Sequence, residues 1–96
     1  MNAKRSPDTP SAGDADAVPH ELSLALAYNL VAARTEIGMS QRTLAAEAGL
    51  ARTYLRRIES GEANVGLGVL MILARVVGKE AADLIRLPPA PNLSKK

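Results

Sequence analysis

Between positions 21 and 87 the apolar residues recur at steps of three and four, and this stretch contains no proline. Such steps place apolar side chains along one face of an α-helix, whereas a half-buried strand would show alternating apolar and polar residues. Capping residues and glycines divide the stretch into segments of helical length. The pattern therefore predicts an all-α domain of five helices.

Local signals at the segment ends predict where these helices begin and end. The hydroxyl of Ser40 can accept a hydrogen bond from the first turn of a following helix, so Ser40 is predicted to be an N-cap. Gly49 and Gly78 are predicted to end two helices because glycine tolerates the left-handed backbone found there. The predicted helices cover about residues 22–35, the residues between Ser40 and Gly49, residues 52–59, the residues from 67 to Gly78, and residues 80–86.

The fourth of these helices is apolar on nearly every side. One stripe is predicted to lie in the core and consists of Leu67, Leu70, Leu73, Ala74 and Val77. The other apolar residues fall outside this stripe, and a domain of this size cannot bury them all. They are Val69, Met71, Ile72 and Val76. Some of them are expected to meet a second subunit, which predicts a homodimer formed through residues 67–87.

The two ends of the chain differ in composition from its centre. Residues 1–20 contain three prolines, small residues and mixed charges without apolar periodicity, and residues 88–96 are similar. Too few apolar groups are available there to offset the entropy lost on ordering. The sequence therefore predicts a disordered arm over residues 1–20, one domain over residues 21–87 and a flexible tail over residues 88–96.

Composition argues against several kinds of chemistry. The 96 residues suffice for one domain, and they include no cysteine and a single histidine, His20, which is assigned to the arm. Disulfides and thiolate zinc sites are therefore excluded, and no metal site or cofactor is expected. The serines lack a histidine partner and the glycines form no phosphate-binding loop, so no enzymatic activity is expected. With no apolar run long enough for a membrane span and no secretory signal, the protein is predicted to be cytoplasmic.

The net charge of +2 says little about whether the partner of this protein is a nucleic acid. Residues 21–87 carry eight arginine or lysine residues and seven acidic ones, so any attraction to nucleic acid depends on where the charges lie. Three of the arginines fall within residues 52–57.

The most informative stretch is SQRTLAAEAGLARTYLRRIESG, residues 40–61. Ala45 permits two helix backbones to approach closely, and Gly49 permits a turn between them. Leu55 and Ile58 can pack the second helix onto the first. This spacing predicts a helix-turn-helix unit.

The second helix of this unit has a polar face opposite Leu55 and Ile58. At about 100° per residue its members fall within an arc of about 140°. They are Arg52, Thr53, Arg56 and Arg57. Such a face suits the DNA major groove, where arginine can pair with guanine and with phosphate, although a solvated helix surface has the same composition. Gln41, at the start of the preceding helix, can donate to a phosphate oxygen.

The segment SQRTLAAEAGLARTYLRRIESGEANVGLGVLMILARVVGKEAADL resembles the Cro/CI repressor-like, or XRE-type, helix-turn-helix family. The run GLARTYLRRIESG is especially similar to small controller regulators of restriction-modification systems. The resemblance implies a five-helix, lambda-repressor-like DNA-binding fold that usually forms a homodimer on a palindromic operator. It implies Gln41 as a phosphate clamp, Arg52, Thr53 and Arg57 as base readers, and Tyr54, Arg56, Ser60 and Asn64 as DNA-backbone contacts. It also implies an internal ion pair between Arg34 and Glu59. For Tyr54, packing on the domain is an equal alternative.

The chain departs from this family at three places. Members commonly have Ser, Thr or Asp at the position of Ala51, Glu at that of Thr43, and Pro-Ser at residues 65–66. Ala51 cannot cap the recognition helix, and loss of a cap costs ~0.5 to 2 kcal/mol. Thr43 in place of Glu removes a capping box. The missing cap at Ala51 predicts a recognition helix that is less rigid before DNA binds.

Together, these features predict a homodimeric, sequence-specific transcriptional regulator, a repressor or autoregulator, whose partner is a double-stranded DNA operator. The alternative is a protein-interaction module on the same fold, such as an antitoxin or antirepressor, with a cognate protein partner. An apolar or acidic outer face on the second helix would favour that alternative. The three arginines favour DNA, although an antitoxin that binds its own promoter would satisfy both hypotheses.

Overall fold

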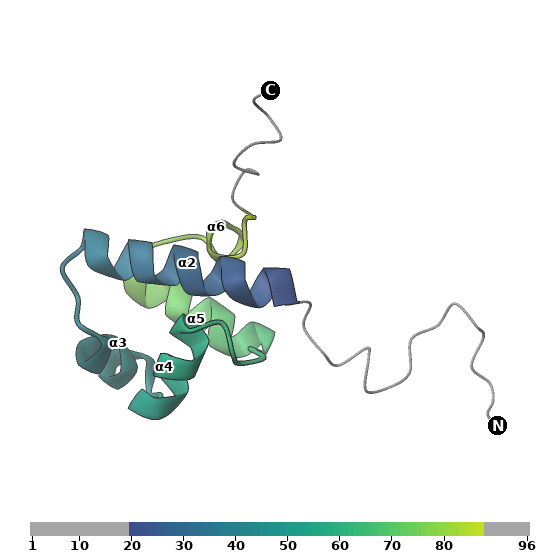
Figure 1. Cartoon of the computed structure of the whole chain (residues 1–96). Helices are drawn as coiled ribbons and strands as arrows, with labels where there is room; N and C mark the ends of the chain where they lie inside the picture. The colour runs from purple at the N-terminus through teal and green to yellow at the C-terminus, as the bar shows by residue number, and fades with distance from the viewer. Residues whose placement is uncertain (1–19, 88–96) are drawn as a thin grey trace, which may run out of the picture.

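The computed structural model describes residues 20–87, whose regular secondary structure consists of five helices (Figure 1). They are α2 His20–Glu36, α3 Gln41–Ala48, α4 Arg52–Glu59, α5 Leu67–Val77 and α6 Ala81–Leu84. The predicted all-α class is confirmed. Apart from residue 20, the arm predicted at the N-terminus lies outside the described residues, as does the tail predicted over residues 88–96.

Helix α3 begins and ends where its local sequence predicts. Ser40 has an extended backbone, and its Oγ accepts a hydrogen bond of 3.0 Å from the N–H of Thr43. Gly49 adopts a left-handed conformation with φ 72° and ends the helix. The bounds predicted for α4 are also confirmed. Helix α3 is therefore specified by residues at its own ends.

Helix α2 begins earlier than predicted, and the assignment of His20 to the arm is wrong. The histidine is the exposed first residue of α2. Glu21 follows it in the first turn, where a carboxylate is favoured by the free N–H groups of the helix end. The helical domain thus includes one residue more than the sequence indicated.

Helix α6 is shorter than predicted. Glu80 is its N-cap and forms a capping box with Asp83. At the other end, the side-chain amide of Asn29 donates to the carbonyl oxygens of Leu84 at 2.9 Å and of Arg86 at 2.8 Å. Asn29 of α2 thus supplies partners for carbonyl groups at and after the end of α6, which no helical turn satisfies.

The helices form two sides of one small domain. α2 crosses over α5 and contacts α4, α5 and α6, whereas α3 contacts α4 and α5 (Figure 1). The α3–α4 pair therefore lies on one side of the domain, and α6 lies on the other (Figure 1).

Each of the five helices contributes a fully buried aliphatic side chain to a common core. These residues are Leu30, Leu44, Leu55, Ile58, Leu73 and Leu84. Burying one such side chain stabilises the fold by roughly 1.5 to 3 kcal/mol. Because three of the six belong to α3 and α4, the same core that holds the domain together also orients this pair.

The prediction that Leu67 lies in the core is wrong, since its side chain is 78% exposed. The remaining members of the predicted stripe are buried: Leu70, Leu73, Ala74 and Val77. Leu67 is the first residue of α5 and borders an apolar groove of about 170 Å³, which is also lined by Leu22 of α2 and Ile85 after α6. Among the described residues, none fills this groove, so the leucine stays exposed at its edge.

Candidate nucleic-acid interface

Helices α3 and α4 are joined by a tight turn at residues 49–51. The N–H of Leu50 donates to the carbonyl oxygen of Ala45 at 2.9 Å, and the N–H of Gly49 donates to that of Ala46 at 3.3 Å. The side chain of Leu50 packs, partly buried, against the core. The turn is therefore anchored by its backbone and by a side chain, which fixes the direction in which α4 leaves it.

Helix α4 has one buried face and one exposed face. Leu55 and Ile58 are 0% and 1% exposed. The exposed side chains are Arg52, Thr53, Arg56 and Arg57. The predicted separation of the two faces is confirmed, and the arginines start from a backbone that the core holds in place.

The exposed arginines of α4 are not neutralised within the described part of the chain. Among residues 20–87, the ion pairs involve the cations Arg34, Lys79 and Arg86, none of which belongs to α4. Nη2 of Arg57 donates to the carbonyl oxygen of Glu62 at 3.5 Å, which is a long and exposed hydrogen bond. The outer face of α4 is thus strongly cationic although the domain is almost neutral.

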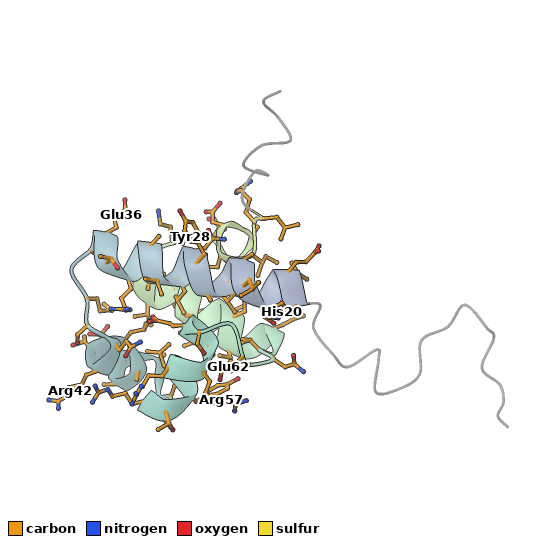
Figure 2. The ribbon with its side chains drawn as sticks, in the orientation of Figure 1. His20, Tyr28, Glu36, Arg42, Arg57 and Glu62 are labelled. Atoms are coloured by element: carbon orange, nitrogen blue, oxygen red, sulfur yellow. The ribbon has the colours of Figure 1, made fainter. Side chains whose placement is uncertain are left out.

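Arg42 extends this cationic surface onto α3, and the sequence analysis did not assign it a role. Its side chain is exposed and projects from the α3–α4 side of the domain, as does that of Arg57, away from Tyr28 and α6 (Figure 2). The signal that could have identified Arg42 is its place next to Gln41 in the first turn of the helix.

A network of side chains ties α3 and α4 to α2. Nε and Nη2 of Arg34 donate to the two carboxylate oxygens of Glu59 at 2.7 and 2.8 Å, so the implied internal ion pair is present. Nη1 of Arg34 donates to the carbonyl oxygen of Met39 at 2.9 Å. The side chains of Arg34 and Glu59 are only 16% and 4% exposed, so three of the five guanidinium N–H groups are bound within a largely buried, bidentate pair.

Gln41 also belongs to this network, a contact that the sequence did not reveal. Its Nε2 donates to Oε1 of Glu59 at 2.7 Å. The two residues are 18 positions apart on different helices, so no local pattern links them. The predicted phosphate clamp therefore already has one of its two amide hydrogens bound within the protein.

The structure places Tyr54 and Ser60 in intramolecular contacts and brings Asn64 near Tyr54. The ring of Tyr54 is partly buried against the core, and its hydroxyl donates to the carbonyl oxygen of Asn64 at 3.3 Å. The hydroxyl of Ser60 donates to the carbonyl oxygen of Arg57 at 3.0 Å. A hydroxyl has one hydrogen, so either residue would have to exchange its present bond for one to DNA.

The N-terminus of α4 is uncapped by any side chain. Ala51 occupies the N-cap position with an extended backbone, φ −65° and ψ 140°, and has no side-chain hydrogen bond. The first N–H groups of α4 therefore lack the partner that a serine or aspartate would supply.

The described segment shows neither a cluster of metal ligands nor a membrane span. No three potential metal ligands cluster among residues 20–87. Within the same residues, no helix has both the length and the hydropathy that crossing a bilayer requires.

Comparison with known proteins places this arrangement among helix-turn-helix proteins. The family model described as helix-turn-helix matches residues 30–84. A hypothetical transcription factor of Neisseria meningitidis serogroup B is 37% identical over 73 residues, which cover 76% of this chain and 68% of that protein. Control protein C.SmaI of Serratia marcescens is 36% identical over 72 residues, which cover 75% of this chain and 86% of that protein.

Solved structures show the same similarity in three dimensions. The crystal structure of the hypothetical transcription factor NHTF from Neisseria aligns with a TM-score of 0.68 at 35% identity, covering 75% of this chain and 85% of that one. The restriction-modification controller protein C.AhdI from Aeromonas hydrophila aligns with a TM-score of 0.62 at 35% identity, covering 65% of this chain and 94% of that one. The described helices thus have counterparts in both sequence and fold.

Proposed function

The chain belongs to the helix-turn-helix family of XRE type, whose members are DNA-binding transcriptional regulators, and we propose that α4 is the helix that reads its operator. In this proposal α4 lies in the major groove of double-stranded DNA. The protein acts in the cytoplasm without catalysing a reaction. Its similarity to control protein C.SmaI and to the controller C.AhdI supports a role as a repressor or autoregulator.

The observation that carries the proposal is the outer face of α4. Arg52, Arg56 and Arg57 are exposed there without an ion-pair partner among residues 20–87. Exposed guanidinium groups attract phosphates and can bind guanine through two hydrogen bonds. The alternative of a protein-interaction module gains no support from α4, because no large apolar side chain lies on this face.

The eight proposed contact residues divide into two groups by role. Arg52, Thr53 and Arg57 discriminate bases from the exposed face of α4, as the family resemblance implies. The other residues contact the DNA backbone and fix the register of the protein on the duplex. They are Gln41, Tyr54, Arg56, Ser60 and Asn64. Arg34 and Glu59 remain an internal pair and are not assigned to DNA.

A homodimer formed through residues 67–87 completes the proposal. Leu67, Met71 and Ile72 of α5 are 78%, 51% and 37% exposed, and Ile85 and Leu87 after α6 are also exposed. Exposed apolar side chains grouped on neighbouring elements are typical of a subunit interface. A two-fold pair would present two copies of α4 to successive major grooves, about 34 Å apart along the duplex.

Selection of preferred duplexes from a random pool tests the proposed function. We expect enrichment of a sequence with two related half-sites, and an affinity for it that exceeds the affinity for random DNA at both low and high salt. Charge attraction alone weakens similarly on every duplex as salt rises, whereas base contacts add a difference between duplexes. Equal affinity for selected and random duplexes at both salt concentrations would contradict sequence-specific regulation.

A further inference from the structure

The carboxylate of Glu59 accepts hydrogen bonds from two different helices. Arg34 of α2 donates to both carboxylate oxygens, and Gln41 of α3 donates to Oε1. Glu59 is the last residue of α4, and its side chain is 4% exposed. A single buried group therefore joins the start of α3 to the end of the recognition helix.

The chemistry of this contact fixes the orientation of the Gln41 amide. A carboxylate has only acceptor atoms, so the amide must turn its nitrogen, and not its oxygen, toward Glu59. The nitrogen carries two hydrogens, of which one is bound to Glu59 and the other remains available. Half a turn of the amide would exchange its nitrogen and its oxygen. The oxygen would then lie where the nitrogen and its available N–H lie now, and an amide oxygen repels a phosphate.

From this geometry we infer that Glu59 is a positioning residue for DNA binding, because it orients the Gln41 amide so that an N–H is presented to a phosphate. The inference rests on the proposed role of Gln41 as a phosphate clamp. It assigns Glu59 a task beyond the ion pair with Arg34, since that pair already supplies each carboxylate oxygen with a guanidinium donor. The same contact fixes the position of the Gln41 side chain relative to α4, the helix proposed to read the bases.

The variant Glu59→Gln distinguishes a positioning role from a simple charge effect, because loss of positioning weakens DNA binding whereas loss of the negative charge strengthens it. Removing a negative charge near DNA should strengthen binding. A glutamine side chain offers an NH₂ group as well as an oxygen, so it no longer dictates which way the Gln41 amide faces. We expect binding that is weaker by roughly threefold to tenfold on both selected and random duplexes, the effect of losing one ordinary hydrogen bond.

Glu47→Gln is the matched charge control. Glu47 is an exposed residue of α3, and this variant makes the same change in net charge. We expect its affinity for both duplexes to be unchanged or slightly higher. Binding is measured at a temperature at which circular dichroism shows every variant to be folded. If Glu59→Gln matched Glu47→Gln in affinity, the inference would be overturned.

A double-mutant cycle with Gln41→Ala distinguishes failure of this inference from failure of the proposed function. If Gln41→Ala leaves both affinities unchanged, the phosphate clamp itself is wrong. Suppose instead that Gln41→Ala weakens binding, and that Glu59→Gln weakens it by the same factor whether residue 41 is Gln or Ala. Gln41 would then contact DNA as proposed, but Glu59 would not act by positioning it. Once Gln41 is removed, we expect Glu59→Gln to leave the affinity unchanged or slightly higher, as Glu47→Gln does, because only the loss of charge remains.

Nuclear magnetic resonance of the unaltered protein gives a readout that does not depend on the stability of a variant. We expect one of the two side-chain amide protons of Gln41 to be shifted from its ordinary position and protected from solvent exchange by its hydrogen bond to Glu59. Addition of a selected duplex should shift the unprotected proton and preserve the protected one. Ordinary chemical shifts and equally fast solvent exchange for both protons in the free protein would contradict the inference.

Discussion

Arg52, Arg56 and Arg57 extend from a helix that is anchored on its other side by Leu55 and Ile58. Both anchors are fully buried, so the positions from which the guanidinium groups extend are set by the core. The arginine side chains themselves are long and exposed, and they can adapt to a duplex. A fixed helix backbone with adaptable side chains suits a helix that enters the major groove and contacts individual bases.

Ala51, the N-cap of α4, is a position at which a single substitution should stabilise the protein. Ala51→Ser is expected to stabilise the protein by about 0.5 to 2 kcal/mol, because the extended backbone at this N-cap lets a hydroxyl accept from the free N–H groups of the first turn. The free energy of unfolding from urea denaturation followed by circular dichroism measures the effect.

Ala46→Ser is the control for this prediction. Ala46 is exposed within α3, where serine has a lower helix propensity than alanine and no cap to form. We expect this change to be slightly destabilising. If both serine variants changed the stability in the same direction, the missing cap at Ala51 would not be the cause.

At the level of helices, α6 depends on a surface network around Asp83. Its carboxylate accepts from Nη2 of Arg86 at 2.6 Å and from the N–H of Glu80 at 3.3 Å. The side-chain hydrogen bond from Arg86 and then the backbone hydrogen bond from Glu80 lower the pKa of Asp83. The folded state therefore favours the ionised carboxylate.

This lowered pKa predicts how α6 responds to acid. Its stabilising contribution is complete above the ordinary aspartate pKa of the unfolded chain and is lost as the pH falls through the lowered folded value. Amide resonances of residues 80–86 should show this loss in an acid titration. Asp83→Asn cannot ionise and should lack it, whereas identical acid titrations for both proteins would refute the role of Asp83.

The sequence predicted the helices well where their ends are determined by neighbouring residues. Ser40 and Gly49 bound α3 through contacts within a few positions, and periodicity alone separated the two faces of α4. The bonds from Asn29 to Leu84 and Arg86 were missed because they join positions more than 50 apart. The bond between Gln41 and Glu59 was missed for the same reason, since it forms only when α3 and α4 come together.

On the scale of the whole domain, the cationic and apolar surfaces occupy different elements. The three arginines proposed to bind DNA lie on α4, whereas the apolar residues of the proposed interface lie exposed on α5 and after α6, where Arg75 and Arg86 are also exposed. Further exposed apolar side chains, Leu24 and Tyr28, lie on α2. The exposure of Leu67, which sequence periodicity assigned to the core, adds to the second surface. A dimer through residues 67–87 would cover the apolar surface and leave the arginines free for DNA.

Met71→Asp tests this dimer. The side chain of Met71 is 51% exposed, so the change should spare the fold, and a charge in an apolar interface should shift the protein toward monomer. Sedimentation at micromolar concentration, with and without a selected duplex, measures the oligomeric state.

Tyr28→Asp is the control. Tyr28 is 67% exposed on α2, outside the predicted interface, so this change should leave the dimer intact. Sedimentation of the unaltered protein as a monomer under both conditions would end the proposal.

The most direct test of the account is the affinity of Arg57→Ala for selected and random duplexes, compared with that of Arg42→Ala. Both variants remove one exposed guanidinium from the α3–α4 side of the domain (Figure 2). If α4 reads bases, Arg57→Ala loses about 1 to 3 kcal/mol of binding free energy on the selected duplex and little on random DNA. Arg42→Ala should affect both duplexes alike, as a contact to phosphate would. Equal losses on the two duplexes for Arg57→Ala would contradict the central claim that α4 is the reading helix.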